Sequence, residues 1–323
     1  MRVLVTGGAG YIGSVVAAQL LSAGHEVVVV DDLSTGHADA VPPGAQFSQR
    51  SITELDPVLG SWSIDAVLHF AAKSLVGEST QEPARYWRNN VVGTVALLDS
   101  MRSFGIGRFV FSSSAATYGD AVEQPIREDA PARPTSPYGA SKLAVDLALA
   151  DYARAYGIGA VSLRYFNVAG ALHAAGASFG ERHATETHLI PNALRAAGGS
   201  GELSLFGTDY PTPDGTCVRD YIHVVDLADA HLRALDAAEP GRHQVINLGS
   251  GRGYSVREVL ATVGTIVGRP VPVVERDRRA GDPPVLVASN ELARSVLGWS
   301  PALDLAAMIE DAWRFEQGRA AAS

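Results

Sequence analysis

A tyrosine and a lysine four residues apart, Tyr138 and Lys142, are the first pair whose spacing suits catalysis. On a helix, residues i and i+4 lie on one face about one turn apart. An isolated tyrosine titrates near ~10, but a neighbouring ammonium favours its phenolate. The pair therefore predicts a general base that removes a proton from a hydroxyl group. Because this spacing occurs by chance on many helices, a surface Tyr/Lys pair is the alternative for the motif alone.

Three consecutive serines, at positions 112–114, favour a catalytic role for that pair over a surface location. They end an apolar run at 108–112 that is typical of a buried strand. The carboxyl ends of strands in parallel sheets face the ligand crevice, so a serine there can hydrogen-bond the oxygen that Tyr138 deprotonates. One serine of this run, Tyr138 and Lys142 are therefore the candidate catalytic residues, and the family resemblance described below implies that the serine is Ser114.

A glycine-rich turn at residues 7–13 follows the first valine-rich run and has the spacing G-x-x-G-x-x-G. Glycines let the backbone turn tightly and approach a pyrophosphate at the start of a helix. Asp31 ends the next strand-like run, where a carboxylate binds the ribose hydroxyls and disfavours a 2′-phosphate. These features predict NAD rather than NADP as the cofactor.

Short β-branched runs alternate with helical patterns in the first half of the chain. The strand-like runs are 2–6, 26–31, 66–70, 108–112 and 160–166, and the helical patterns are 12–23, 82–103 and 137–156. This alternation predicts an α/β fold with a doubly wound parallel (Rossmann) sheet and a smaller C-terminal substrate-binding lobe. The expected NAD-binding domain is 1–166 plus about 219–250, and the expected substrate-binding lobe is about 167–218 plus 251–323.

The bulk composition excludes several classes of protein. The chain has 323 residues and a formal net charge of −9, which is against nonspecific nucleic-acid binding. It holds no apolar run near the ~20 residues that cross a bilayer. Its single cysteine, Cys217, cannot form an internal disulfide. We expect a cytoplasmic protein that binds neither nucleic acid nor membrane.

Motifs along nearly the whole chain resemble the extended short-chain dehydrogenase/reductase superfamily and, within it, the UDP-glucose (UDP-galactose) 4-epimerase family. They are TGGAGYIGS, HFAA followed by VGES, NNVVGT, FSSSAATYGD, SPYGASK, RYFNVAG, DYPTPDGTCVRDYIHVVDLAD and NLGSG. The resemblance implies NAD-dependent inversion at C4 of UDP-glucose or UDP-galactose through a 4-keto intermediate. It also implies a homodimer formed through the helices at 82–103 and 137–156.

The resemblance further implies the ligand contacts. The implied cofactor contacts are Gly7, Gly10, Tyr11, Ile12, Gly13, Asp31, Asp32, Leu33, Ser34, Ser51, Ile52, Phe70, Ala71, Ala72, Asn90, Tyr138, Lys142 and Phe166. The implied UDP-sugar contacts are Ser114, Tyr138, Asn167, His188, Leu189, Phe206, Arg219, Arg279, Asp282 and Leu286. Arg219 and Arg279 suit a diphosphate because guanidinium forks pair with its oxygens, although each alone could form a surface salt bridge.

Three positions depart from the family's usual residues. Ser51 replaces an Asp that contacts adenine in many relatives, and His188 replaces an Asn of some relatives. Leu286 stands where a residue is thought to gate N-acetylated sugars, so epimerisation of UDP-N-acetylhexosamines is an alternative activity.

Two other functions and a metal site are weighed against this interpretation. A sugar-nucleotide 4,6-dehydratase carries an Asp-Glu pair where this chain has Ala115-Ala116. A non-catalytic NAD-binding regulator is expected to lose the catalytic residues, which are all present. The segment from His183 to His188 lacks the HExxH spacing, so we expect a polar loop there and no metal.

Overall fold

Seven parallel strands form the central sheet of the computed structural model, which describes residues 1–121, 123–174, 176–279 and 281–322. In spatial order the strands are β12 (His243–Leu248), β6 (Gly159–Tyr165), β5 (Arg108–Ser114), β4 (Ala66–His69), β1 (Arg2–Thr6), β2 (Glu26–Asp31) and β3 (Gln46–Gln49). The order reverses between β1 and β4, which places the ligand crevice at their carboxyl ends. The predicted doubly wound fold is confirmed.

Alternate side chains of the strands pack into two separate hydrophobic cores, because successive side chains of a strand point to opposite faces of the sheet. Val27 and Val29 of β2 join one hydrophobic cluster, whereas Val28 and Val30 join the other. Helices α1 (Tyr11–Ser22), α8 (Val224–Ala237) and α10 (Glu291–Leu297) cover the first face. Helices α2 (Asp56–Ser61), α5 (Gly93–Ser103) and α6 (Pro137–Tyr156) cover the second. Both faces are therefore buried, which explains the valine-rich strands.

The helical segment expected at 82–103 consists of three consecutive parts. These are α4 (Pro83–Tyr86), the π-helix η2 (Trp87–Val92) and α5. A π-helical turn shifts the register of the residues that follow and is frequent at functional sites. Here it lies beside α6, the helix that carries Tyr138 and Lys142.

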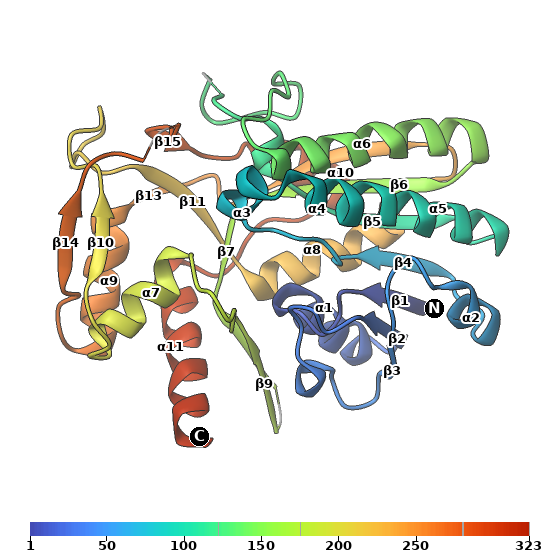
Figure 1. Ribbon diagram of the computed structural model, residues 1–323, viewed down its shortest axis with the longest axis horizontal. Coiled ribbons are helices and arrows are strands. Elements are labelled where there is room, and N and C mark those ends of the chain that lie inside the picture. Colours follow the sequence, from blue (N-terminus) through green and yellow to red (C-terminus); the bar gives the residue numbers. More distant parts are fainter. Residues whose placement is uncertain (122, 175, 280, 323) are drawn as a thin grey trace.

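A smaller lobe lies to one side of the sheet (Figure 1). Its strands are β7 (Asn167–Ala169), β10 (Leu203–Phe206), β11 (Val218–His223), β13 (Gly253–Ser255), β14 (Val273–Arg276) and β15 (Val285–Leu286). Its helices are α7 (Leu189–Ala197), α9 (Val256–Val267) and α11 (Leu305–Ala322), which share a third core with Leu194, Val259 and Met308. The hairpin of β8 (Ala171–Ala174) and β9 (Ala177–Gly180) was not predicted. Short elements complete the chain: η1 (Ala38–Ala40), α3 (Val76–Gln81) and η3 (Ala115–Thr117).

Two elements lie across the domain bounds expected from the sequence. β11 pairs with β7, β13 and β15 in the small sheet, so residues 218–223 belong to the lobe's sheet. Conversely, α10 lies within the range expected for the lobe, yet it packs against α8 and β12 of the central layer. The division into two folding domains stays a prediction.

Within the described ranges, no helix is long and apolar enough to span a bilayer.

A buried ion pair fixes α6 to the sheet. Asp146 of α6 accepts hydrogen bonds from Arg164 of β6 at 2.8 and 3.0 Å and from the Ser113 hydroxyl of β5 at 3.2 Å. The side chains of Asp146 and Arg164 are 3% and 6% exposed. Removing one partner of such a pair leaves an uncompensated buried charge.

We predict that Asp146→Ala lowers the free energy of unfolding by about 3–5 kcal/mol, measured by urea denaturation. The matched control is Asp151→Ala on the same helix. Asp151 pairs with Arg154 where both side chains are more than three-quarters exposed, so its loss costs less than about 1 kcal/mol. Equal losses in the two variants would contradict the assignment.

Candidate active site

The glycine turn between β1 and α1 is shaped by close backbone contacts. Gly7 has φ +75°, and a Cβ there would lie 2.6 Å from the Ala71 nitrogen. A Cβ on Gly13 would lie 2.2 Å from the Gly7 carbonyl oxygen. The turn therefore folds only with glycine at these positions and opens the first turn of α1 towards the crevice. Such a turn accepts a pyrophosphate on its N–H groups.

Asp31, at the end of β2, ties the glycine turn to the loop that follows the strand. One carboxylate oxygen accepts the Ala9 N–H at 3.0 Å, and the other accepts the Leu33 N–H at 2.8 Å. Burial raises the pKa of Asp31, and these two donors oppose that shift. Each carboxylate oxygen keeps a further lone pair, so the group can still accept ribose hydroxyls.

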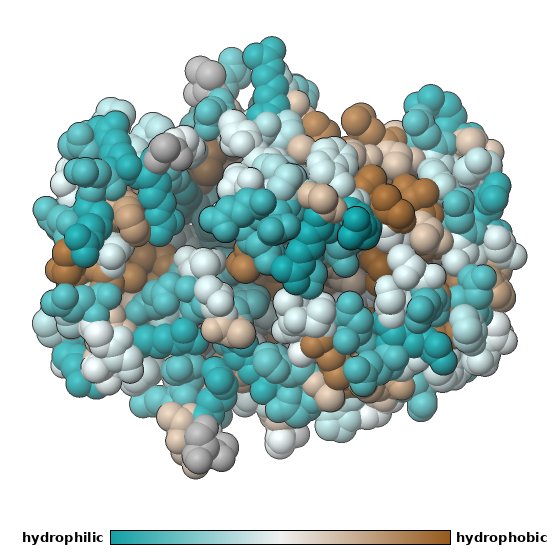
Figure 2. Space-filling model, in the orientation of Figure 1, coloured by the Kyte–Doolittle hydropathy of each residue, from teal (hydrophilic) through white to brown (hydrophobic). Residues whose placement is uncertain are grey.

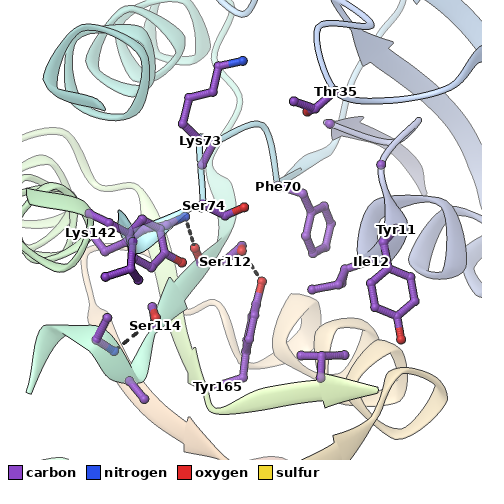
Figure 3. Close-up of a pocket in the computed structure, with 18 of the residues that line it drawn as sticks. Tyr11, Ile12, Thr35, Phe70, Lys73, Ser74, Ser112, Ser114, Lys142 and Tyr165 are labelled. Atoms are coloured by element: carbon purple, nitrogen blue, oxygen red, sulfur yellow. Dashed lines mark hydrogen bonds between the residues drawn. The ribbon is translucent and has the colours of Figure 1, made fainter. Parts of the chain in front are cut away.

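The predicted catalytic side chains all line the cleft, and Figure 3 shows Ser114 and Lys142 on one side of it. Lys142 is 2% exposed, and its ammonium donates to the Ser112 carbonyl oxygen at 2.6 Å. The Lys142 nitrogen also lies 5.9 Å from the centre of the Tyr138 ring. Ser114 Oγ accepts the Ala116 N–H at 3.1 Å, which fixes the hydroxyl at the cleft end of β5. Tyr11 and Ile12 of the glycine turn lie on the opposite side of the cleft.

Burial controls the charges of the catalytic pair. It lowers the pKa of Lys142 to about 7, although Asp146 opposes the shift. It raises the pKa of Tyr138, and hydrogen bonding with Ser114 opposes that rise. The lowered tyrosine pKa expected from the Tyr/Lys spacing is therefore not produced by the protein's groups alone. Desolvation outweighs the Ser114 hydrogen bond, and the positive nicotinamide ring of a bound NAD would favour the phenolate.

The cleft has a volume of about 490 Å³, within the range of ~300–1,000 Å³ typical of small-molecule sites. Most of the predicted ligand contacts line it. They are Gly7, Gly10, Tyr11, Ile12, Gly13, Asp31, Asp32, Ser34, Ser51, Ile52, Phe70, Ala71, Ala72, Ser114, Tyr138, Lys142, Phe166, Asn167, His188, Arg219 and Leu286. The glycine cradle and Asp31 at one end, with Tyr138 and Lys142 further along, fit an NAD molecule.

Six predicted contacts do not line this cleft in the described part of the chain: Leu33, Asn90, Leu189, Phe206, Arg279 and Asp282. Asn90 is buried and exchanges hydrogen bonds with the Lys73 backbone at 2.8 and 3.0 Å. Arg279 lies over the Phe206 ring, 4.0 Å from its centre. Asp282 pairs with Arg219, which does face the cleft. Asn90 and Asp282 therefore contact residues that line the cleft without lining it themselves.

Several lining residues were missed by the sequence reasoning, among them Lys73, Asn89, Ser112, Tyr165 and Glu181. Ser112 and Tyr165 stand near the ends of adjacent strands β5 and β6, and their hydroxyls form a hydrogen bond. The position of Tyr165 at a strand end was a usable signal. Asn89 reaches the cleft from the π-helix η2, which periodicity did not reveal.

Fold and site together define an NAD-dependent enzyme of the short-chain dehydrogenase/reductase type. Residues 3–249 match the model of the NAD dependent epimerase/dehydratase family, and the chain belongs to this family. The resemblance to UDP-glucose 4-epimerases is confirmed.

Individual relatives span almost the whole chain. The UDP-glucose 4-epimerase of Corynebacterium glutamicum is 51% identical over 98% of this chain and 95% of that protein. The structure of UDP-glucose 4-epimerase from Brucella ovis in complex with NAD has 47% identity and a TM-score of 0.92, covering 97% of this chain and 98% of that one. The enzyme from Stenotrophomonas maltophila with bound NAD and formylated UDP-arabinopyranose has 40% identity and a TM-score of 0.95, and both chains are covered completely.

We predict that Gly13→Ala weakens NAD binding by about tenfold or more, equivalent to at least about 1.4 kcal/mol. The added methyl group would meet the Gly7 carbonyl and push the turn open. Bound NAD is measured by equilibrium titration. Gly107→Ala is the control because a Cβ there meets nothing within 4 Å. Wild-type affinity in Gly13→Ala would show that the turn does not hold the cofactor.

Proposed function

We propose that this chain interconverts UDP-glucose and UDP-galactose by inverting C4 of the sugar, with NAD as a resident cofactor. The observation that carries the proposal is the convergence of Ser114, Tyr138 and Lys142 on the same cleft as the glycine turn. The family membership and the names of the relatives agree with it.

The residues of the cleft account for the proton transfers. Tyr138 takes the proton from the sugar's 4-hydroxyl, and Ser114 hydrogen-bonds the same oxygen. NAD, held by the glycine turn and Asp31, would supply the hydride acceptor for C4 and the hydride donor for the 4-keto sugar. Tyr138 then gives its proton back to the oxygen. Each cycle therefore ends with the enzyme unchanged.

The other end of the cleft suits the diphosphate of the substrate. The Arg219 guanidinium lines the cleft and is 13% exposed, with Asp282 fixing its position. Arg219 and Leu286 are register partners on the adjacent strands β11 and β15. Arg219 would hold the diphosphate while the keto sugar turns about its bond to the phosphate. Leu286 would limit the size of the substituent on that sugar.

The alternative functions have less support. Ala115 and Ala116 line the cleft directly after β5 with methyl groups, so these positions offer no acid or base for a dehydratase. A non-catalytic regulator has no need of the buried Lys142, whose ammonium is desolvated in the cleft. UDP-N-acetylhexosamines remain a second substrate class because Leu286 lines the site.

The proposal is tested by incubating the protein with UDP-galactose, with no added cofactor, and following the sugar signals by proton NMR. We predict that UDP-glucose forms and that the same mixture is reached from either direction. Tyr138→Phe should lose about 10²–10⁴-fold or more in rate while retaining NAD. Tyr152→Phe on the same helix, which loses only a bond to Asp99, should remain active. No turnover even after NAD is added, or full activity of Tyr138→Phe, would refute the assignment.

We also propose a homodimer, supported by exposed apolar side chains on η2 and α6. Trp87 and Val92 are 43% and 60% exposed, and Leu147 and Tyr156 are 62% and 50% exposed. Figure 2 shows hydrophobic surface over the region where Figure 1 places α4 and α5. Exposed apolar patches of this kind mark association surfaces.

The lone cysteine is free, as expected in a reducing compartment, and we propose a cytoplasmic location.

We predict that light scattering gives twice the chain mass for the wild type and a monomer mass for Leu147→Asp. A carboxylate in the centre of an apolar interface is left without a partner. Phe47→Asp is the control because Phe47 is an exposed apolar residue on the edge strand β3, away from η2 and α6. A monomeric wild type at micromolar concentration would exclude the dimer.

A further inference from the structure

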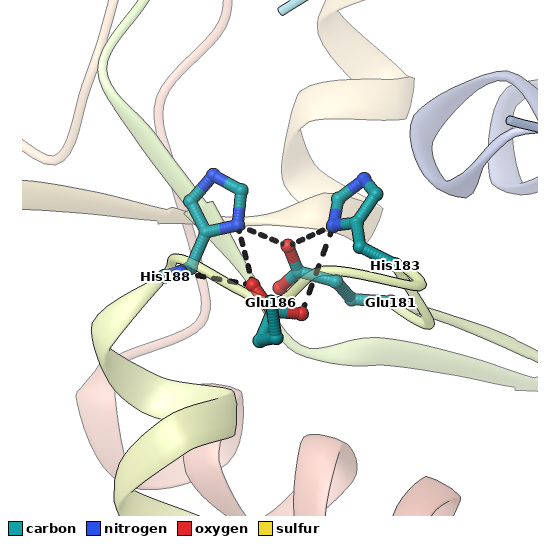
Figure 4. Close-up of side chains that lie close together, drawn as sticks. All are labelled: Glu181, His183, Glu186 and His188. Atoms are coloured by element: carbon teal, nitrogen blue, oxygen red, sulfur yellow. Dashed lines mark hydrogen bonds and ion pairs between the residues drawn. The ribbon is translucent and has the colours of Figure 1, made fainter. Parts of the chain in front are cut away.

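Two glutamates and two histidines meet between the end of β9 and the start of α7 (Figure 4). This Glu/His cluster consists of Glu181, His183, Glu186 and His188. One ligand atom from each residue lies within 4.8 Å of all the others. Glu181, His183 and His188 also line the cleft, so the cluster borders the substrate site.

The distances between these atoms suit a small coordination sphere. His188 Nδ1 lies 2.6 Å from Glu181 Oε1 and 2.9 Å from Glu186 Oε1. His183 Nδ1 lies 3.1 Å from Glu181 Oε1 and 3.7 Å from Glu186 Oε2. In a tetrahedral site with bonds of ~2.0–2.2 Å, neighbouring ligand atoms are about 3.3–3.6 Å apart. The observed separations lie on both sides of that value.

Two atoms of the cluster are buried without a hydrogen-bond partner in the described part of the chain. They are His183 Nδ1 and Glu186 Oε2. The Glu186 side chain is 1% exposed, and its other oxygen accepts the N–H groups of Thr187 and His188, both at 2.8 Å. The backbone thus orients this carboxylate, and its second oxygen lies 3.7 Å from His183 Nδ1 without a hydrogen bond. A buried polar atom left unpaired is costly unless something else binds it.

An ion-pair network is the competing explanation. Glu181 and Glu186 raise the pKa of His183 to about 9, and against the effect of burial they raise that of His188 to about 10. Two protonated imidazoles would neutralise the two negative charges of the carboxylates. One divalent cation bound by neutral imidazoles would neutralise the same two charges. The separation of His183 Nδ1 and Glu186 Oε2 favours the cation, because at 3.7 Å the two buried atoms are beyond hydrogen-bond distance but close to the spacing of two ligands on one ion.

We propose that the Glu/His cluster binds one divalent transition-metal cation of the zinc class, through His183 Nδ1, His188 Nδ1 and the carboxylates of Glu181 and Glu186. Imidazole nitrogen with carboxylate oxygen is a ligand set that suits such an ion. The ion would join the end of β9 to the residue before α7. Its role is to hold the 181–188 segment as a wall of the cleft, rather than to take part in the reaction.

The spacing within 183–188 predicted no metal, because it does not match a helical metal-binding motif. Glu181 lies outside that segment, and the β8–β9 hairpin brings it beside the two histidines. A loop can gather ligands that no regular spacing reveals.

The test measures metal content and stability of the full-length holoenzyme. The protein is treated with a chelator, desalted and titrated with Zn²⁺, with bound metal counted by elemental analysis. We expect one equivalent per chain, a higher Tm with Zn²⁺, and absorption bands of tetrahedral Co²⁺ when Co²⁺ replaces it. The double variant His183→Ala/Glu186→Gln should bind at least about 10–100-fold more weakly.

A matched control separates ligand loss from general damage. The double variant His25→Ala/Glu54→Gln removes the same two residue types away from the cluster and should keep the full equivalent of metal. The proposal is overturned if the wild type binds no more Zn²⁺ than the cluster variant. It is equally overturned if Zn²⁺ leaves the Tm unchanged, or if Co²⁺ gives no tetrahedral spectrum. Because none of these readouts depends on sugar turnover, the proposed function is tested separately.

Discussion

The docking of α6 on strands β5 and β6 is the contact on which the active site depends. Tyr138, Lys142 and Asp146 follow one another at intervals of four, so they lie along one stripe of the helix. Asp146 holds that stripe to Arg164 and Ser113, and Lys142 holds it to the Ser112 carbonyl. A shift of the helix by one residue would break both anchors and turn Tyr138 away from Ser114. The buried ion pair therefore sets the register of the catalytic residues.

The same burial that fixes these groups also suppresses their charges. Desolvation favours the neutral forms of both Tyr138 and Lys142, as their opposite pKa shifts show. Oxidised NAD carries a positive charge on its nicotinamide ring, which would favour the phenolate of Tyr138. We therefore expect the activity of the proposed base to depend on bound cofactor.

The sequence was sufficient for the features that depend on local chemistry. The strand-ending glycines, Asp31, Ser114 and the Tyr138/Lys142 pair all line one cleft, as predicted. The sequence did not reveal the features of the cleft that have no local signal. A π-helical turn brings Asn89 to the cleft while Asn90 faces inward, and the hairpin that delivers Glu181 lies in a segment without a clear period. The stacking of Arg279 on Phe206 depends on the fold of the lobe, which brings together residues 73 positions apart in the sequence. No local sequence pattern encodes such a contact.

In the proposed reaction, hydride leaves C4 of the sugar and returns to the same carbon without exchange with water. The decisive experiment uses UDP-galactose deuterated at C4, converted in ordinary water with no added cofactor. Hydride transfer predicts UDP-glucose that retains the deuterium at C4, detected by mass spectrometry and by the missing H4 signal in proton NMR. Replacement of the deuterium by solvent hydrogen would contradict this mechanism, because C4 would then be inverted by deprotonation instead of by hydride transfer.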